Sequence, residues 1–174
     1  MILVTGASGV SSEHLRRIES SGQQVVFMQH ESEKLPVSSS TVEAVMCNSL
    51  FDHHAVDSFS RLKLVQATSA GLDRLPLGLL GANGVTVKPA RGVYSPAIAE
   101  FVVLLILQLY KKTSILLARQ RRHVWKKERD LKEVTGLTAC IVGHGSVGRA
   151  VSERLRPFGI SILAIGSDTP KHVI

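Results

Sequence analysis

Residues 137–148 read LTACIVGHGSVG and give the clearest indication of the fold. Its first six residues are mostly apolar, which predicts a buried β-strand from Leu137 to Val142. A helix is expected from Arg149 to about Pro157, because apolar side chains recur at four-residue intervals at Val147, Val151 and Leu155. A second apolar run, 160–165, follows. Strand, glycine turn, helix and strand together predict the first βαβ unit of a Rossmann domain.

The glycines between strand and helix match the spacing G-x-G-x-x-G, and each has a mechanical role in that setting. Gly143 permits the tight turn, Gly145 lets the main chain approach a pyrophosphate, and Gly148 lets helix and strand pack closely. The helix N-terminus adds free N–H groups and partial positive charge. The predicted cofactor-binding residues are therefore Gly143, His144, Gly145, Ser146, Val147 and Gly148. The alternative is a purely structural glycine-rich turn, and no catalytic role is expected for His144.

The residue at the end of the second Rossmann strand separates the two nicotinamide cofactors, because NAD-selective folds place an acidic side chain there. Counting along the strand puts Gly166 at this position, with Ser167 next and Asp168 two places late. Gly166 leaves room for a 2′-phosphate that Ser167 and Lys171 could bind, although an inward-pointing Asp168 would oppose it. The sequence indicates NADP or NAD, slightly favouring NADP, and adds Ser167 to the predicted cofactor-binding residues.

The first 92 residues predict a separate α/β domain. Five short apolar runs, at 2–4, 25–28, 42–47, 63–67 and 85–87, alternate with polar or helical stretches. This pattern predicts a flavodoxin-like parallel sheet with helices on both faces. The expected domains are 1–92, a connecting helix and basic loop at 93–136, and an incomplete nucleotide-binding domain at 137–174. Thr5 to Gly9 (TGASG) resembles a nucleotide-binding loop, but Ser12 occupies its third glycine position, which favours an ordinary turn.

A long helix is predicted to begin at Ser95, whose side chain would cap the first turn, with Pro96 at the first helical position. Past Lys111 the sequence becomes basic: in 111–132 the basic residues outnumber the acidic ones by seven, which equals the net charge of +7. A solvated helix end and loop is the main interpretation, and an anion-attracting surface is the alternative. Nucleic-acid binding is not favoured, because Trp125 is the only aromatic residue past Lys111 in this segment.

Other features of the composition suggest an ordinary cytoplasmic globule. Phe101 to Leu107 is apolar but too short to span a bilayer, and the N-terminus lacks the pattern of a signal peptide. Cys47 and Cys140 each lie in an apolar run and are expected to be buried reduced thiols. No metal site is expected, since the His53-His54 doublet lacks an evident third ligand.

Three segments together resemble the D-isomer-specific 2-hydroxyacid dehydrogenase family, which includes glyoxylate/hydroxypyruvate reductases and phosphoglycerate dehydrogenases. They are Gln66 to Leu75 (QATSAGLDRL), Gly92 to Glu100 (GVYSPAIAE) and Leu137 to Gly159. The resemblance implies a nicotinamide-dependent oxidoreductase that transfers hydride between NAD(P) and a small 2-hydroxy or 2-keto acid. It also implies that main-chain N–H groups at Ser69, Ala70 and Gly71 hold the substrate carboxylate.

In this family the catalytic Arg, Glu and His come from the later part of the cofactor domain. The resemblance therefore implies that the 174 residues end before the catalytic residues, so the chain contains none and is inactive alone. It further implies a homodimer to which the 95–120 helix contributes. The competing hypotheses are a non-catalytic nucleotide-binding or scaffold protein derived from the family and, last in order, a nucleic-acid-binding protein.

Overall fold

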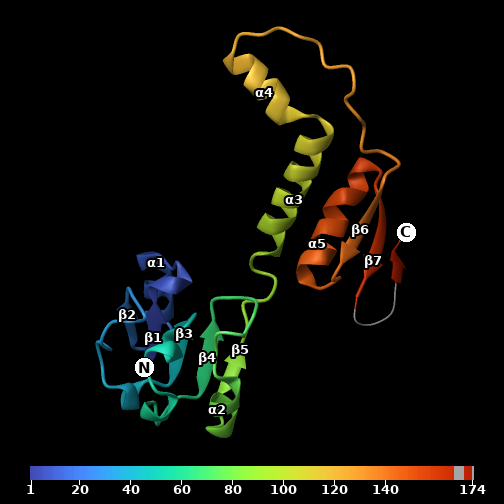
Figure 1. The fold of residues 1–174 in the computed structure, drawn as a ribbon. Helices are drawn as coiled ribbons and strands as arrows, with labels where there is room; N and C mark the ends of the chain where they lie inside the picture. Colours follow the sequence, from blue (N-terminus) through green and yellow to red (C-terminus); the bar gives the residue numbers. More distant parts are fainter. Residues whose placement is uncertain (167–170, 174) are drawn as a thin grey trace. The chain divides into compact units, whose positions relative to one another are not determined.

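The computed structural model describes residues 1–166 and 171–173. The chain divides into two compact units, Met1–Arg91 and Gly92–Ile174 (Figure 1). The first contains a five-stranded sheet and the second a smaller sheet with its own hydrophobic core. The predicted parallel-sheet α/β class is confirmed.

The sheet of the first unit is entirely parallel and has the strand order β2-β1-β3-β4-β5. Parallel strands bury both faces, which accounts for their continuous apolar sequences. Leu3, Val45 and Val65 lie side by side on three neighbouring strands and are at most 1% exposed. The order is that of flavodoxin-like folds, as predicted. The strands are β1 (Ile2–Thr5), β2 (Val25–Met28), β3 (Ala44–Cys47), β4 (Leu64–Ala67) and β5 (Thr86–Lys88).

The connections in this unit are less helical than the sequence pattern suggested. α1 (Ser12–Glu19) joins β1 to β2, and α2 (Leu77–Ala82) joins β4 to β5. The other two connections contain only the 3₁₀ turns η2 (Ser39–Thr41), η3 (Leu50–Asp52) and η4 (Val56–Ser58). Buried Leu50 and Val56 in these turns pack into the core. Short turns therefore cover part of the sheet where full helices were expected.

The second unit contains the predicted βαβ unit. β6 (Thr138–Val142) and β7 (Ser161–Ile165) are parallel and are joined by α5 (Ser146–Leu155) and the 3₁₀ turn η5 (Arg156–Phe158). Two predictions were wrong in detail. α5 begins at Ser146 rather than Arg149, and a third strand, β8 (Lys171–Val173), pairs antiparallel with β7 where only two strands were expected.

One face of this smaller sheet is covered and the other is open. Ala139, Ile141, Ile162 and Ala164 share the face that packs into the core, together with Leu155 of α5. The alternate residues on β6 point the other way, so that Cys140 is exposed and Val142 is 82% exposed. The expectation that both cysteines are buried therefore holds for Cys47 and is wrong for Cys140.

The long predicted helix is two helices, α3 (Ser95–Tyr110) and α4 (Thr113–Arg121), bent by 69°. The break lies at Lys112, whose φ of 49° is left-handed and cannot continue a right-handed helix. The predicted Ser95 cap was also wrong: Tyr94 occupies the capping position, and Ser95 is the buried first residue of α3. No single described helix is long and apolar enough to cross a membrane; only the bent pair reaches that length and composition together.

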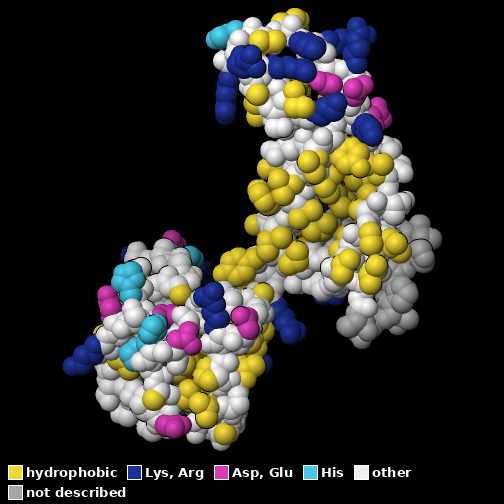
Figure 2. Space-filling model, in the orientation of Figure 1, with side chains coloured by type: hydrophobic (Ala, Val, Ile, Leu, Met, Phe, Trp, Pro, Cys, Tyr) yellow, Lys and Arg dark blue, Asp and Glu magenta, His cyan; other side chains and the backbone are white. Residues whose placement is uncertain are grey.

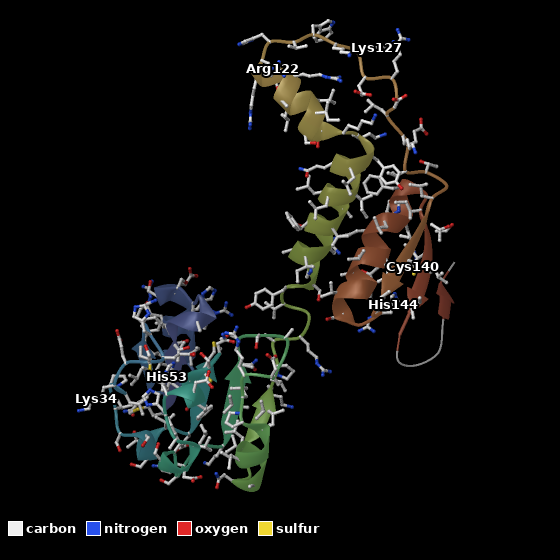
Figure 3. The ribbon with its side chains drawn as sticks, viewed as in Figure 1. Lys34, His53, Arg122, Lys127, Cys140 and His144 are labelled. Atoms are coloured by element: carbon white, nitrogen blue, oxygen red, sulfur yellow. The ribbon has the colours of Figure 1, made fainter. Side chains whose placement is uncertain are left out.

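Ion pairs hold the basic loop after α4 against the helices. Lys112 Nζ lies 3.1 Å from Glu128 Oε1, and Arg119 Nη2 lies 3.0 Å from Glu128 Oε2. Hydrogen bonding from Lys112, followed by its charge and the Arg119 contact, lowers the pKa of Glu128 despite some burial. Part of the positive charge of 111–132 is thus neutralised locally, while Arg122 and Lys127 extend from the tip of this region (Figure 3).

We predict that Leu80→Ala destabilises the first unit by about 2–5 kcal/mol, because Leu80 is 0% exposed and its loss leaves a cavity. The matched control is the neighbouring Leu79→Ala, in the same helix but 56% exposed, which should change the free energy of unfolding by no more than about 0.5 kcal/mol. Urea unfolding measures both. Equal losses would contradict the assignment of Leu80 to the core.

Candidate functional site

The glycine turn lies where the parallel strands of the second unit end. β6 ends at Val142, and Gly143 turns the chain with a φ of 90°, which L side chains rarely adopt. The N–H of Gly143 donates to the carbonyl oxygen of Ile165 at 2.7 Å, which fixes the turn to the end of β7. Ligands of open α/β sheets bind at these carboxyl ends. The turn is therefore the part of this unit best placed to meet a ligand.

Gly148 is required by the packing of α5 against the turn. A β-carbon at this position would overlap the carbonyl oxygen of Gly143 and lie 3.3 Å from a methyl group of Ile141. Neither the turn nor the strand can move away without disturbing the sheet. The structure therefore gives the third glycine the packing role that the sequence motif assigns to it.

Gly145 differs from Gly148, because nothing lies within 4 Å of the point where its β-carbon would be. It is the N-cap of α5, with extended backbone angles and no side-chain hydrogen bond to the first turn. The N–H groups of Ser146 and Val147 lie in that first turn, where an α-helix offers no main-chain partner. Open space beside unshared N–H groups and a helix dipole fits the diphosphate of a dinucleotide.

The ring of His144 is held by the helix that follows it. Its Nε2 lies 3.1 Å from Ser152 Oγ, and Ser152 Oγ donates to the carbonyl oxygen of Gly148 at 2.8 Å. Because Ser152 has one proton to give, the geometry requires His144 Nε2–H as the donor. Figure 3 shows His144 beside the base of α5. Its imidazole thus stabilises the turn, and any contact with a cofactor would come from its main chain.

Ser152 is the residue of this site that the sequence analysis missed. It is 3% exposed and links the carbonyl of Gly148 to the ring of His144. A signal was present, since a serine four residues after the last glycine lies one turn further along the same helix face. The predicted contact at Ser167 lies outside the described residues, so the NADP preference that depends on it stays a prediction.

The other predicted site lies in the first unit, in the loop after β4. Ser69 is half-buried, while Ala70 and Gly71 are exposed. Ser69 Oγ donates to the carbonyl oxygen of Gly71 at 2.6 Å, and the carbonyl of Ser69 accepts from Ala90 N–H at 2.9 Å. Within the described chain, the N–H groups of Ser69, Ala70 and Gly71 have no protein acceptor. Three successive unshared donors in a loop closed by its own serine could hold a small anion.

The described residues contain no group of three or more His, Cys, Asp or Glu side chains that could hold a metal ion.

Comparison with known families matches residues 103–173 to the family described as D-isomer specific 2-hydroxyacid dehydrogenase, NAD binding domain. The hydroxypyruvate reductase of Thermotoga maritima is 26% identical over 117 residues, which cover 67% of this chain and 38% of the reductase. The chain thus spans little more than a third of that relative's length.

Two solved structures share the fold. The D-lactate dehydrogenase of Aquifex aeolicus, complexed with NAD and lactic acid, has a TM-score of 0.75 at 21% identity and covers 97% of this chain and 52% of its own. The NADPH-dependent glyoxylate/hydroxypyruvate reductase of Sinorhizobium meliloti also has a TM-score of 0.75 at 21% identity, over 99% of this chain and 56% of its own. At these identities the likeness establishes the fold.

We predict that Gly148→Ala destabilises the second unit by about 1–3 kcal/mol, because the added methyl group displaces the Gly143 carbonyl. Gly145→Ser is the matched control: it adds a larger side chain into open space at a position that favours serine, so stability should change by about 0.5 kcal/mol or less. Urea unfolding, with hydrogen exchange at β6 and β7 to locate the effect, measures both. An unchanged Gly148→Ala protein would contradict the close packing described above.

Proposed function

We propose that the glycine turn of this chain binds the diphosphate of a nicotinamide dinucleotide, a proposal supported by the similarity of residues 103–173 to the NAD binding domain of the D-isomer specific 2-hydroxyacid dehydrogenases. The observation that carries the proposal is the contrast between Gly145 and Gly148. One glycine is dictated by internal packing, whereas the other faces open space beside the N-terminus of α5. In the proposed complex, Gly143 to Gly148 hold the diphosphate, and Ser167, which lies outside the described residues, is proposed as a further cofactor contact.

The proposed ligand of the first unit is a small 2-keto or 2-hydroxy acid. Its carboxylate would accept hydrogen bonds from the unshared N–H groups of Ser69, Ala70 and Gly71, which are open to approach because the neighbouring side chains are small. A bound nicotinamide cofactor supplies or accepts the hydride. The residues of this chain would bind and orient the two reactants.

For the 174 residues alone we propose binding without turnover. Reduction of a keto acid leaves an alkoxide that needs a proton donor beside the carbonyl. The resemblance to the family implies that its catalytic Arg, Glu and His are not among these residues, and the ring of His144 is already bonded to Ser152. NAD and NADP are both retained as cofactors, with NADP slightly favoured, and a cytoplasmic location is proposed.

A homodimer is proposed through α3. Ile98, Phe101, Leu105 and Leu109 repeat at helical spacing, and Phe101 and Leu109 are 59% and 76% exposed. Figure 2 shows hydrophobic side chains gathered over this helix. Exposed apolar patches of this kind mark interaction surfaces in soluble proteins.

We predict that Gly145→Asp abolishes most cofactor binding while keeping the fold. Aspartate is a favoured N-cap, so α5 should be as stable as before, but its carboxylate repels the diphosphate. The affinity for NADPH and NADH, measured by fluorescence titration, should fall at least about ten-fold, which corresponds to roughly 1.4 kcal/mol.

The control is Gly145→Asn, which has nearly the same size and capping ability without the charge and should bind more tightly than the aspartate variant. Cofactor binding by the unmodified chain that Gly145→Asp leaves unchanged would refute the proposed diphosphate site. Turnover of glyoxylate or hydroxypyruvate by the 174 residues would refute the proposal of binding without catalysis.

We predict that the unmodified chain sediments as a dimer and that the double variant Phe101→Glu, Leu109→Glu sediments as a monomer. Two charges on the apolar stripe would be buried without partners in the dimer. Gln23→Glu adds a charge to an exposed position of the first unit and should leave the dimer intact. A dimer of equal stability in the double variant would place the interface elsewhere.

A further inference from the structure

The loop after β2 contains a buried carboxylate that the proposed function does not use. Glu31 is 9% exposed, and hydrogen-bond donors surround its side chain. Oε1 accepts from Thr5 Oγ1 at 2.6 Å and from Asn48 N–H at 2.8 Å. Oε2 accepts from Ser49 N–H at 2.7 Å and from Ser49 Oγ at 3.0 Å. Both oxygens are thus held by two donors each.

These donors lie at one particular place in the sheet. Thr5 is the last residue of β1, and Asn48 and Ser49 follow β3 directly. In a sheet of order β2-β1-β3-β4-β5, the connections leave β1 and β3 in opposite directions, and the carboxyl ends of these two strands form the crevice where such folds bind ligands. Glu31 reaches this point from the end of β2, across β1. The carboxylate therefore occupies the ligand position of the fold.

The carboxylate is charged in this position. Burial by itself would raise the pKa of Glu31, but the hydrogen bonds from Thr5, Asn48 and Ser49 together outweigh burial and lower it. The neighbouring Cys47 responds to the same charge: burial, with the Glu31 carboxylate as a second cause, raises the pKa of its thiol to about 12. The donors thus stabilise an anion, not a neutral acid.

The loop that resembles a nucleotide-binding motif is engaged in the same arrangement. Besides the bond from Thr5 to Glu31, Ser8 Oγ donates to the Thr5 carbonyl at 2.7 Å, and a β-carbon at Gly6 would overlap the carbonyl oxygen of Gln29. Beside the carboxylate lies a cavity of about 380 Å³, lined in part by Gly6, His30 and His53.

We infer that the carboxyl ends of β1 and β3 form an oxyanion-binding site whose resident anion is the side chain of Glu31. The site is made for a carboxylate or phosphate group, and the chain supplies that group from its own β2 loop. The donors around the Glu31 carboxylate are consequently taken, whereas the N–H groups of the loop after β4 have no protein acceptor within the described chain. A carboxylate that merely fills space, with its loop held by other contacts, is the alternative that the experiment has to exclude.

The test replaces the side chain with a free anion. Glu31→Ala removes a fragment the size of acetate, and thermal unfolding is followed as acetate replaces chloride at constant ionic strength. The variant should be stabilised along a saturation curve, with the unfolding constant falling about ten-fold when acetate reaches roughly nine times its Kd. The unmodified chain, whose site is filled, should show no saturable effect. No saturable stabilisation of Glu31→Ala by acetate would overturn the inference.

Two variants control for general salt effects. Glu31→Gln keeps the shape but turns an amide N–H toward the donors, so it should be destabilised and acetate should not restore it, because the site is full. Glu43→Ala removes a partly exposed carboxylate paired with Arg61 and Lys63, and acetate should not affect it specifically. If Glu31→Ala does not fold in chloride, the variant is refolded in acetate instead. Folding in acetate but not in chloride supports the inference, and failure to fold in either salt overturns it.

The unmodified chain offers an independent measurement. Because folding lowers the pKa of Glu31, its contribution to stability is complete above the ordinary value of 4.5 and is lost as the pH falls through the lower folded value. The amide protons of Asn48 and Ser49 should shift together in NMR spectra with a midpoint below 4.5. Amide shifts that do not titrate, or that titrate above this value, would contradict the bound carboxylate.

Discussion

The candidate cofactor site depends on one steric constraint, the approach of α5 to the carbonyl oxygen of Gly143. Because residue 148 has no side chain, the first turn of the helix lies directly against the end of β6. This approach leaves Gly145 at the tip of the turn with open space around it, and it brings the first-turn N–H groups to the carboxyl edge of the sheet. His144 and Ser152 then hold the arrangement from the side of the helix. The turn is thus shaped before any ligand arrives, which reduces the entropy lost on binding.

The two units use the same chemistry in opposite ways. Each places hydrogen-bond donors at the carboxyl ends of parallel strands, where main-chain N–H groups favour negative charge. After β6, the N–H groups in the first turn of α5 receive no side-chain cap from the N-cap residue. Between β1 and β3, the carboxylate of Glu31 accepts hydrogen bonds from the donors. A glycine-containing loop after a strand is therefore insufficient evidence of a ligand site, because a single side chain from a neighbouring loop can fill it.

The sequence predicted the strands, the strand–turn–helix unit and the role of Gly148, because each depends on local periodicity or on a motif whose geometry is fixed. It did not predict the position of Glu31, because hydrogen bonds to Thr5 and Ser49 join residues far apart in the chain. The break at Lys112 was missed for a different reason: apolar residues continue on both sides, and only the left-handed backbone of one residue divides the helix. Cys140 was expected to be buried because an apolar strand does not reveal which of its faces is covered.

The exposed face of β6 carries a cysteine thiol that chemical reagents can reach. The sequence contains two cysteines, and the thiol of Cys47 is both buried and, with a pKa of about 12, almost entirely protonated at neutral pH. Thiolates are the reactive species toward alkylating reagents. A maleimide dye should therefore attach at Cys140, in the strand that leads into the glycine turn, without any engineered cysteine. The emission of a fluorophore at that position would respond to changes in its surroundings near the glycine turn at the end of β6.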